Sequence, residues 1–286
     1  MKILILGGSG QIGTVITRDV VAAFPNAEVL SCSRSGKGLN GYKFNVFQKD
    51  WSAFGKIDVI INSVGIIAEE GDNTFEKIHI DVVRNILKSR ESMGNPKIIH
   101  ISVLGADINS KSGYASTKGV ANDILKKEEN VNIISPSFVC TPGTMMIGKL
   151  KMLHTMAKWQ LNFLPCPAHF LSAKFQPIMG EDIAELVIEM IKQDLKDEHV
   201  YGTGPEIYSL EDWINIVGKG KIKLIRIPKW LIDKPFQLIT ILFPFIMNKD
   251  QYILLGNDNI HENSDLKRVL GREPKSTRNF WEVELS

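Results

Sequence analysis

A tyrosine, a lysine and a serine are spaced so that together they could move a proton. Tyr114 and Lys118 form a Y-x-x-x-K pattern, and Ser102 lies upstream of both. On a helix, the i, i+4 spacing puts Tyr114 and Lys118 on one face. A free tyrosine has a pKa of about 10, and a neighbouring ammonium group lowers that pKa by stabilising the phenolate. We therefore predict that Tyr114 is a general acid or base, that Lys118 lowers its pKa, and that Ser102 orients a substrate oxygen. On its own, Y-x-x-x-K is common on amphipathic helices, so its meaning depends on what surrounds it.

A glycine-rich stretch near the start of the chain has the pattern of a nucleotide cradle. The stretch GGSGQIG, residues 7–13, contains G-x-x-G-x-x-G and follows the apolar run 2–6. Glycine permits the positive φ of a tight turn, lets the backbone approach a pyrophosphate, and lets the helix pack close to the strand. The helix N-terminus adds free N–H groups and a partial positive charge. The residues predicted to bind a dinucleotide here are Gly7, Ser9, Gly10, Gln11, Ile12 and Gly13. The alternative is a tight turn without a ligand.

The end of the second predicted strand indicates which dinucleotide fits. NAD sites place an Asp or Glu there, about 20 residues beyond the glycines, to hold the ribose 2′-hydroxyl. Here Ser33 stands at that place, Arg34 follows it, and Lys37 is nearby. A guanidinium group can pair with a 2′-phosphate, and a serine hydroxyl can donate a hydrogen bond to it. Ser33 and Arg34 therefore favour NADP(H) over NAD(H). The alternative is an arginine solvated on a surface loop.

Further candidate residues end the third and fourth predicted strands. Those after the fourth strand are Asn62, Ser63, Val64 and Gly65, whose glycine permits close approach to the adenosine ribose and phosphate. Asn45 and Val46 end the third strand and would flank the adenine. With a nicotinamide at this edge, Tyr114 would exchange a proton with the substrate while hydride moves to or from the ring. Lys118 would also bind the nicotinamide ribose hydroxyls.

The first half of the chain alternates strand-like and helix-like segments, which predicts an α/β fold. Helical spacing or stop signals define three helices, at residues 11–24, 74–93 and 113–129. Six apolar runs predict strands, at residues 2–6, 28–32, 42–46, 57–61, 97–101 and 131–134. Repeated strand–helix units form a parallel sheet covered on both faces. We therefore expect a Rossmann-type doubly wound sheet of order 3-2-1-4-5-6, with the ligand beyond the carboxyl ends of its strands.

The second half is less regular and predicts a smaller lobe. Helices are expected at residues 145–161, 181–193 and 209–217 and from 228 onward, strands at 200–201 and 221–227, and a loop at 164–167. Ser209 could cap its helix, with Asp212 at the N3 position. We predict a nucleotide-binding domain of residues 1–140, to whose sheet 174–202 return. Residues 141–173 and 203–286 would form a lobe that covers the cleft.

Composition excludes several classes of protein. The 286 residues include 34 basic and 32 acidic side chains, a net charge of +2, which is too balanced for a nucleic-acid binder. The cysteines Cys32, Cys140 and Cys166 are far apart and fit a reducing compartment, so we expect a cytoplasmic protein. No signal peptide, transmembrane run or metal-binding histidine pattern is predicted.

Two segments leave several interpretations open. Residues 145–159 are basic and rich in methionine, which suits the pocket of a large apolar substrate, an anionic membrane surface, or a helix that packs over the cleft with its lysines in solvent. Residues 230–247 are apolar and bracketed by lysines, and they suit a membrane surface or packing in a core or dimer. Peripheral membrane association is therefore one expectation for this chain.

The glycine pattern, Ser102 and Y-x-x-x-K together resemble the short-chain dehydrogenase/reductase superfamily, of the extended or atypical type. A closer likeness covers nearly the whole chain. It is carried by 62–66, 75–79, 100–107, 175–178, 204–210 and 256–259, which resemble the nucleotide-binding accessory subunit of mitochondrial complex I and its bacterial relatives. This resemblance implies an NADPH-holding fold whose role is in some members structural. It also implies that Pro136, Phe138 and Val139 line the nicotinamide.

The chain departs from the extended enzymes at two positions. His79 stands where they usually have asparagine, and Val103 stands where they often have a second serine or threonine.

Three functions remain open. The first is an oxidoreductase that transfers hydride to or from a carbonyl or hydroxyl group of an unidentified small-molecule substrate, for which an apolar molecule is one candidate. The second is an NADPH-binding accessory protein of a respiratory membrane complex, without turnover. The third is a sugar-nucleotide epimerase or dehydratase, against which the absence of an arginine cluster in the second half counts.

Overall fold

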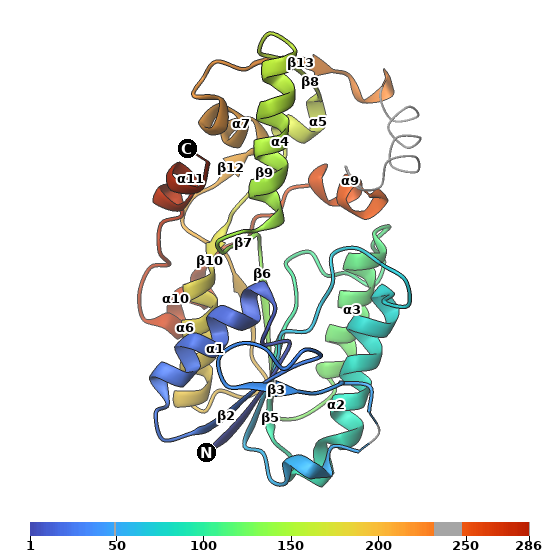
Figure 1. Cartoon of the computed structure of the whole chain (residues 1–286), viewed down its shortest axis with the longest axis vertical. Helices are drawn as coiled ribbons and strands as arrows, with labels where there is room; N and C mark the ends of the chain where they lie inside the picture. The colour runs from blue at the N-terminus through green and yellow to red at the C-terminus, as the bar shows by residue number, and fades with distance from the viewer. Residues whose placement is uncertain (49, 232–247, 286) are drawn as a thin grey trace.

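The chain folds into two lobes, the larger of which is built on a seven-stranded parallel sheet (Figure 1). The computed structural model describes residues 1–48, 50–231 and 248–285. The strand order is β3-β2-β1-β4-β5-β6-β11, so the predicted order 3-2-1-4-5-6 is confirmed, and β11 extends it. The strands are β1 (Lys2–Leu6), β2 (Glu28–Ser33), β3 (Gly41–Lys43), β4 (Val59–Asn62), β5 (Lys97–Ile101), β6 (Val131–Pro136) and β11 (His199–Gly202).

Helices cover both faces of this sheet, which explains why its central strands are buried throughout. All residues of β4, β5 and β6 are buried. One face carries α1 (Gln11–Ala23), α6 (Gly180–Lys192) and α10 (Ser264–Leu270), and the other carries α2 (Val82–Arg90) and α3 (Gly113–Leu125). The doubly wound Rossmann-type fold expected from the sequence is therefore confirmed.

The helix predicted for residues 74–93 has an irregular start. It opens with the π-helical turn η2 (Glu76–Asp81), continues as α2, and closes with the 3₁₀ turn η3 (Glu91–Met93). Gly94 then ends it with a φ of 83°, as its position in the stop signal predicts. The π-helical turn contains His79, which is buried. Such turns widen the helix locally and frequently occur at functional sites.

The smaller lobe packs several short elements around buried aromatic side chains, including the fully buried rings of Trp213 and Trp281. Its elements are α4 (Met145–Trp159), β8 (Phe163–Pro167), α5 (Ala168–Ser172), α7 (Leu210–Gly218), β13 (Lys223–Ile227), α9 (Lys249–Leu255) and α11 (Arg278–Leu285). Two small sheets join the lobes, β7 (Val139–Cys140) with β10 (Ile178–Met179), and β9 (Lys174–Phe175) with β12 (Tyr208–Ser209). Ser209 and Asp212 form the capping box predicted at the start of α7.

One element of this lobe was wrongly predicted. Residues 164–167 were expected to form a loop because of their prolines, but they belong to β8, which pairs in parallel with β13. β8 pairs with β13 alone in a two-stranded sheet, so Pro165 and Pro167 lie on a strand that has a free edge. A proline lacks the N–H that an interior strand needs, and an edge tolerates this. The helix expected from residue 228 lies outside the described residues from 232 to 247.

No helix in the described ranges is long and apolar enough to cross a membrane. Helix α4 buries Ile147, Leu150 and Ala157 in the core of the smaller lobe. Met152 and Met156 are more than a third exposed. Part of the methionine-rich segment is therefore core, and part of it faces solvent.

A buried carboxylate ties the end of the chain to α6. Asp182 is fully buried, and it accepts hydrogen bonds from Arg272 Nη2 at 2.6 Å and from the Lys275 backbone N–H at 2.7 Å. Arg272 also pairs with Glu185 through Nε at 3.2 Å. Removing one partner of a buried ion pair leaves an uncompensated charge, which costs more than losing a pair at the surface.

We predict that Arg272→Met lowers the free energy of unfolding by about 2 to 4 kcal/mol, because Asp182 would stay buried without its cation. Urea denaturation followed by circular dichroism measures the change. Arg268→Met is the matched control. That arginine pairs with Glu198 at the surface, at 2.8 Å, and its loss should cost less than about 1 kcal/mol. Equal effects of the two substitutions would contradict the prediction.

Candidate functional site

The glycine stretch forms a tight turn between β1 and α1. Gly7 has a φ of 80°, in the region that favours glycine. The backbone N–H groups of Gly7 and Gly8 donate to Cys32 O at 2.9 and 3.2 Å, and the Gly10 N–H donates to Gly7 O at 2.9 Å. These bonds fix the turn at the end of the neighbouring strand β2 and direct the chain into α1.

The absence of side chains lets the turn and helix approach each other closely. A Cβ atom on Gly13 would lie 2.2 Å from Gly7 O, and one on Gly8 would lie 2.0 Å from Ser31 Oγ. Both distances are far below van der Waals contact. Gly13 was predicted from its spacing, and its Cβ would meet backbone atoms, whereas Gly8 was not predicted and its Cβ would meet the side chains of Ser31 and Thr17. Gly10 is the residue immediately before α1.

The N-terminus of α1 carries no charge that would compete with an anion. Its first turn holds no acidic residue, and its first N–H groups lie beyond the reach of intrahelical acceptors. Ser9 is exposed, and the Gln11 side chain donates from Nε2 to Gly143 O at 2.9 Å. This last bond links the glycine turn to the loop that precedes α4. The turn therefore presents backbone donors and a positive helix end at the carboxyl edge of the sheet.

Ser33 and Arg34 follow β2 as predicted, but their surroundings differ. Ser33 is buried, and its Oγ accepts a hydrogen bond from the Gly36 N–H at 3.0 Å. Arg34 is exposed, and its guanidinium group donates a long hydrogen bond from Nη1 to Asn73 Oδ1, at 3.5 Å. The guanidinium group is therefore loosely held and can turn to a new partner.

The residues that end β3 and β4 hold their own loops in place. Asn62 is buried and makes two bonds, as Nδ2 lies 3.0 Å from His100 Nδ1, and Oδ1 accepts from the Val64 N–H at 3.2 Å. Ser63 Oγ donates to Leu6 O at 2.8 Å, which joins this loop to the glycine turn. At β3, the Asn45 side chain accepts from a following N–H, and Val46 O accepts from Asn85.

The side chain of Lys118 lies in the same region. Its Nζ is buried and donates to Ile101 O, at the end of β5, at 3.0 Å. A Cβ atom on Gly65 would lie 3.5 Å from that Nζ, so the glycine leaves space beside the ammonium group. Burial lowers the pKa of Lys118 to about 8. The structure thus brings Lys118 and Gly65 together, a proximity that the sequence analysis does not predict.

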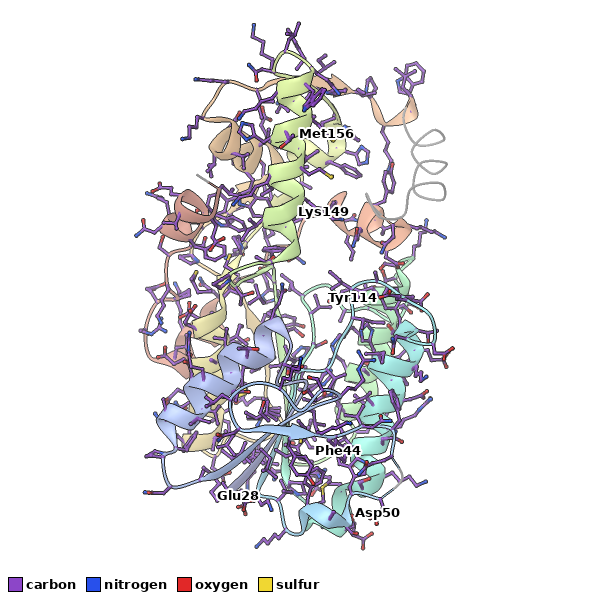
Figure 2. All side chains as sticks on the ribbon, viewed as in Figure 1. Glu28, Phe44, Asp50, Tyr114, Lys149 and Met156 are labelled. Carbon is purple, nitrogen blue, oxygen red and sulfur yellow. The ribbon has the colours of Figure 1, made fainter. Side chains whose placement is uncertain are left out.

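Tyr114 lies at the start of α3, at the end of the larger lobe that faces the smaller one (Figure 2). Its ring packs edge-on against Phe75 and His79, with centroids 5.8 and 5.5 Å apart. Burial raises the pKa of Tyr114 to about 12. The lowered pKa predicted from Y-x-x-x-K is therefore wrong for the free protein, because desolvation of the phenolate is the dominant influence.

Ser102 follows β5 and has an unsatisfied hydroxyl group. The side chain is buried, and its Oγ has no hydrogen-bond partner among the residues that the structure describes. Its backbone N–H donates to Ile134 O at 2.7 Å. Buried hydroxyls are normally hydrogen-bonded, so this one is a candidate for a bond to a ligand.

His79 occupies a structural position beside Tyr114. Its Nδ1 lies 2.9 Å from Thr117 Oγ1, and its Nε2 lies 3.3 Å from the Ile66 N–H. Thr117 Oγ1 in turn lies 2.7 Å from Gly113 O. The Nε2 atom of His79 also lies 3.1 Å from Ile66 O, so a neutral ring pairs with the Ile66 N–H when its proton is on Nδ1 and with the Ile66 carbonyl when its proton is on Nε2. Burial lowers the pKa of His79 to about 3, which keeps the ring neutral. His79 thereby joins the loop after β4 to α3.

One contact that holds α3 has no signal in the sequence. Asp250, in α9 of the smaller lobe, accepts from Ser112 Oγ at 2.8 Å and from the Tyr114 N–H at 3.3 Å. A carboxylate at a helix N-terminus is stabilised by the free N–H groups and the helix dipole. The smaller lobe therefore helps to position Tyr114.

The segment after β6 connects the larger lobe to the core of the smaller one. Pro136 ends β6, and its O accepts from the Leu104 N–H at 2.7 Å. Val139 begins β7, and the Phe138 ring lies 5.9 Å from Trp213 and 6.0 Å from Trp281. Phe138 therefore packs toward the core of the smaller lobe.

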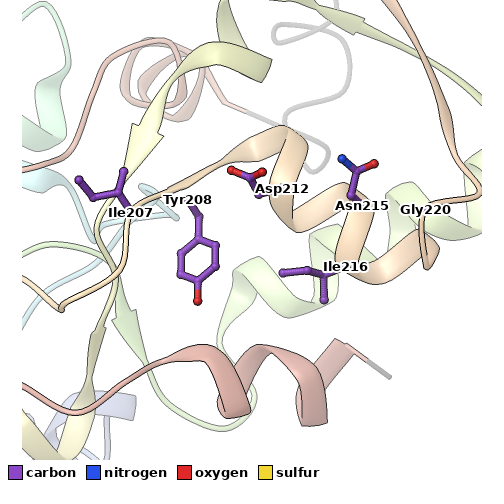
Figure 3. Close-up of a pocket in the computed structure, with 6 residues that line it drawn as sticks. All are labelled: Ile207, Tyr208, Asp212, Asn215, Ile216 and Gly220. Atoms are coloured by element: carbon purple, nitrogen blue, oxygen red, sulfur yellow. The ribbon is translucent and has the colours of Figure 1, made fainter.

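Two cavities lie away from the predicted site residues. One, of about 560 Å³, lies in the smaller lobe beside Tyr208, Asp212 and Ile216 (Figure 3). The other, of about 470 Å³, lies between α3 and β11 beside Asn122, Ser135 and His199. No predicted site residue lines either cavity. Among the described residues, no group of His, Cys, Asp or Glu could hold a metal ion.

No model of a known protein family matches the chain. Curated relatives are similar to it, and two mitochondrial proteins are among them. The first is the mitochondrial 40 kDa subunit of NADH-ubiquinone oxidoreductase from Neurospora crassa, 23% identical over 230 residues, which are 78% of this chain and 59% of the relative. The second is subunit 9 of the NADH dehydrogenase (ubiquinone) 1 alpha subcomplex from Mus musculus, a mitochondrial protein, 26% identical over 157 residues, 54% of this chain and 40% of the relative. The chain thus spans about half the length of the curated relatives it matches.

Solved structures share the fold at low sequence identity. A nucleoside-diphosphate-sugar epimerase from Staphylococcus aureus has a TM-score of 0.74 and 18% identity, and the match covers 99% of this chain and all of the other. The RMD protein from Pseudomonas aeruginosa, complexed with NADPH, has a TM-score of 0.69 and 12% identity, and the match covers 99% of this chain and 96% of the other. A UDP-glucuronic acid 4-epimerase from Bacillus cereus, complexed with NAD, has a TM-score of 0.69 and 15% identity, and the match covers 100% of this chain and 98% of the other. The resemblance found in the sequence is confirmed.

The lowered pKa of Lys118 predicts a change of stability with pH. Between about pH 8 and 10.5, the unfolded chain still binds the proton that the folded Lys118 has released, so the free energy of unfolding rises with pH. Lys118→Met removes this contribution. We expect the stability of the wild type, relative to Lys118→Met, to increase between pH 7 and 10 in urea denaturation.

Lys88→Met is the control for this experiment, because Lys88 is exposed on α2. Its stability relative to the wild type should show no comparable rise. If the difference in the free energy of unfolding between the wild type and Lys118→Met stays constant across this pH range, the lowered pKa of Lys118 is contradicted.

Proposed function

We propose that this chain binds a nicotinamide dinucleotide at the carboxyl edge of its sheet, with NADP(H) preferred over NAD(H). The free N–H groups at the start of α1 would bind the pyrophosphate. The exposed Arg34 guanidinium would pair with the 2′-phosphate, and no acidic side chain follows β2 to repel it. Solved structures with this fold hold NADPH or NAD, which agrees with a cofactor of this class.

One observation carries the proposal. The glycine turn follows β1, and Gly65 lies in the loop after β4. Ser102 follows β5, and the Lys118 side chain donates to Ile101 O at the end of the same strand. The strands β1, β4 and β5 are direct neighbours in the sheet. A phosphate-binding turn and two buried polar groups thus share one edge. Lys118 Nζ would bind ribose hydroxyls, and Ser102 Oγ would find the partner that it lacks.

The proposed reaction is hydride transfer between the nicotinamide and a carbonyl or hydroxyl group of a small molecule. A bound nicotinamide supplies or accepts the hydride. The phenol of Tyr114 is protonated at neutral pH, as in an ordinary tyrosine, so it is available to donate its proton to a carbonyl oxygen during reduction. Burial raises its pKa to about 12 in the free protein, so this role requires that the bound nicotinamide and Lys118 stabilise the phenolate. A charged Lys118 would then stabilise the phenolate that remains.

A second candidate is an NADPH-binding accessory protein without turnover. Both curated relatives are named as subunits of the respiratory NADH dehydrogenase. The Tyr114 ring is also packed tightly against its neighbours, and Val103 stands where a second hydroxyl would help to orient a substrate. An association with a respiratory complex would follow from this candidate.

A third candidate, a sugar-nucleotide epimerase, has the support of the structural neighbours alone. A second diphosphate is best held by a cluster of free arginines, which bind it in a bidentate way. Arg226 in that lobe already pairs with Glu211 at 2.5 Å. We therefore place this function last.

We predict that Arg34→Ala weakens NADPH binding at least tenfold and changes NADH binding little, because the side chain would contact the 2′-phosphate that NADH lacks. Titration with nucleotide fluorescence measures both affinities. Arg84→Ala is the matched control, since Arg84 is exposed and pairs with Asp81 on α2. An equal loss of affinity for both nucleotides would rule out Arg34 as the 2′-phosphate ligand.

We predict that the wild type oxidises NADPH with a panel of aldehydes, ketones and quinones, and that Tyr114→Phe lowers the rate at least a hundredfold with little loss of NADPH affinity. Tyr42→Phe is the control, because Tyr42 lies on the exposed edge strand β3. If the wild type binds NADPH but oxidises it no faster than Tyr114→Phe does with this panel, the accessory function replaces the catalytic one. If NADPH does not bind, both proposals fail.

A further inference from the structure

The charges of the chain are unevenly distributed. Residues 130–180 contain four lysines and no Asp or Glu, and residues 213–231 contain five basic residues and no Asp or Glu. The chain as a whole has a net charge of only +2, so its remaining part holds more acidic than basic side chains. Both acid-free segments contribute to the smaller lobe, through α4, β8 and β13. The basic residues at the far end of this lobe are Lys158, Lys219, Lys221, Lys223, Arg226 and Lys229, of which Arg226 pairs with Glu211.

Large apolar side chains are exposed at this same end. We call this surface the lobe tip and define it by Trp159, Leu161, Phe163, Ile225, Trp230 and Leu231. Trp159 is 86% exposed, Leu161 84% and Trp230 77%. The tip lies at the top of Figure 1, where α4 ends beside β8 and β13, and it is the part of the smaller lobe farthest from the sheet of the larger lobe.

Local structure holds these side chains outward. Met152, Met156 and Trp159 are spaced four and three residues apart, so they form one exposed stripe along α4 that ends at the tip (Figure 2). After α4, Leu161 and Asn162 both have positive φ values, 54° and 65°. This conformation is uncommon for a residue such as leucine, and it turns the chain directly from α4 into β8.

Basic side chains surround the apolar ones. Lys158 precedes Trp159 on α4, and Lys223 Nζ lies 5.5 Å above the Phe163 ring. Lys219, Lys221 and Lys229 lie in or beside the segments that form the tip. Tryptophan and leucine beside long lysine side chains suit an interface that is apolar within and negatively charged at its surface.

We propose that the lobe tip docks on the surface of an anionic lipid bilayer. The exposed tryptophans and Leu161 would enter the boundary between headgroups and acyl chains, and the lysines would contact the anionic headgroups. Charge argues against a second copy of the chain as the partner, because two positively charged tips repel each other. The proposal does not rest on nucleotide binding, and it requires no segment that crosses the membrane.

The tryptophans of this chain provide a direct reporter. Trp51, Trp213 and Trp281 are at most 1% exposed, so a change in tryptophan fluorescence on adding vesicles reports Trp159 and Trp230. We expect a blue shift and co-sedimentation with vesicles of phosphatidylcholine and phosphatidylglycerol. Vesicles of phosphatidylcholine alone should bind much less protein, and high salt should weaken binding to the anionic vesicles.

The variant Trp159→Ser/Leu161→Ser should bind anionic vesicles at least tenfold more weakly. Both side chains are exposed, so folding should be retained, which unchanged NADPH affinity and circular dichroism would report. Ile67→Ser/Ile108→Ser is the matched control, with two exposed isoleucines of the larger lobe, and it should bind as the wild type does. Lys158→Glu/Lys223→Glu should also weaken binding, whereas Lys88→Glu/Lys127→Glu should not.

Absence of binding to anionic vesicles would overturn the proposal, as would equal binding by the wild type and Trp159→Ser/Leu161→Ser. The proposal would also be overturned if the wild type does not bind vesicles and light scattering shows that it is a dimer. Loss of this dimer in Trp159→Ser/Leu161→Ser would assign the lobe tip to self-association. Failure to bind NADPH would leave the lipid result unaffected, so the two proposals fail separately.

Discussion

The close approach between the first strand and the first helix is the constraint on which the candidate site depends. A Cβ atom on Gly13 would lie 2.2 Å from Gly7 O, so any side chain there would push α1 away from the turn. The same approach brings the N–H groups of α1 to the carboxyl edge of the sheet. Ser63 Oγ bonds Leu6 O at that edge, and the ends of β4 and β5 follow in register. The position of every other candidate residue is set relative to this turn.

Burial then decides the chemistry of the groups around the turn. Lys118 is held by Ile101 O and loses part of its basicity, while Tyr114 is held by aromatic neighbours and becomes a weaker acid. His79 stays neutral and acts as a brace between a loop and α3. The smaller lobe takes part through Asp250, which caps α3 beside Tyr114. The candidate site is therefore built by both lobes, and the larger lobe supplies its glycine turn.

Local patterns could be predicted from the sequence, and contacts between distant segments could not. The glycine turn, the helical face of Tyr114 and Lys118, and the capping box of Ser209 and Asp212 each depend on residues a few positions apart. β8 was missed because its prolines are tolerated only at the free edge that pairing with β13 leaves. The pKa of Tyr114 was predicted in the wrong direction because spacing says nothing of desolvation. Asp250 is 138 residues from Ser112, and no local signal connects them.

The most direct test of the central claim is a crystal structure of the protein grown with NADPH. The account predicts a pyrophosphate bonded to the first N–H groups of α1, a 2′-phosphate on Arg34, and a nicotinamide ribose beside Lys118 Nζ. An empty glycine turn at saturating NADPH, or a nucleotide bound elsewhere with its phosphates away from α1, would contradict it.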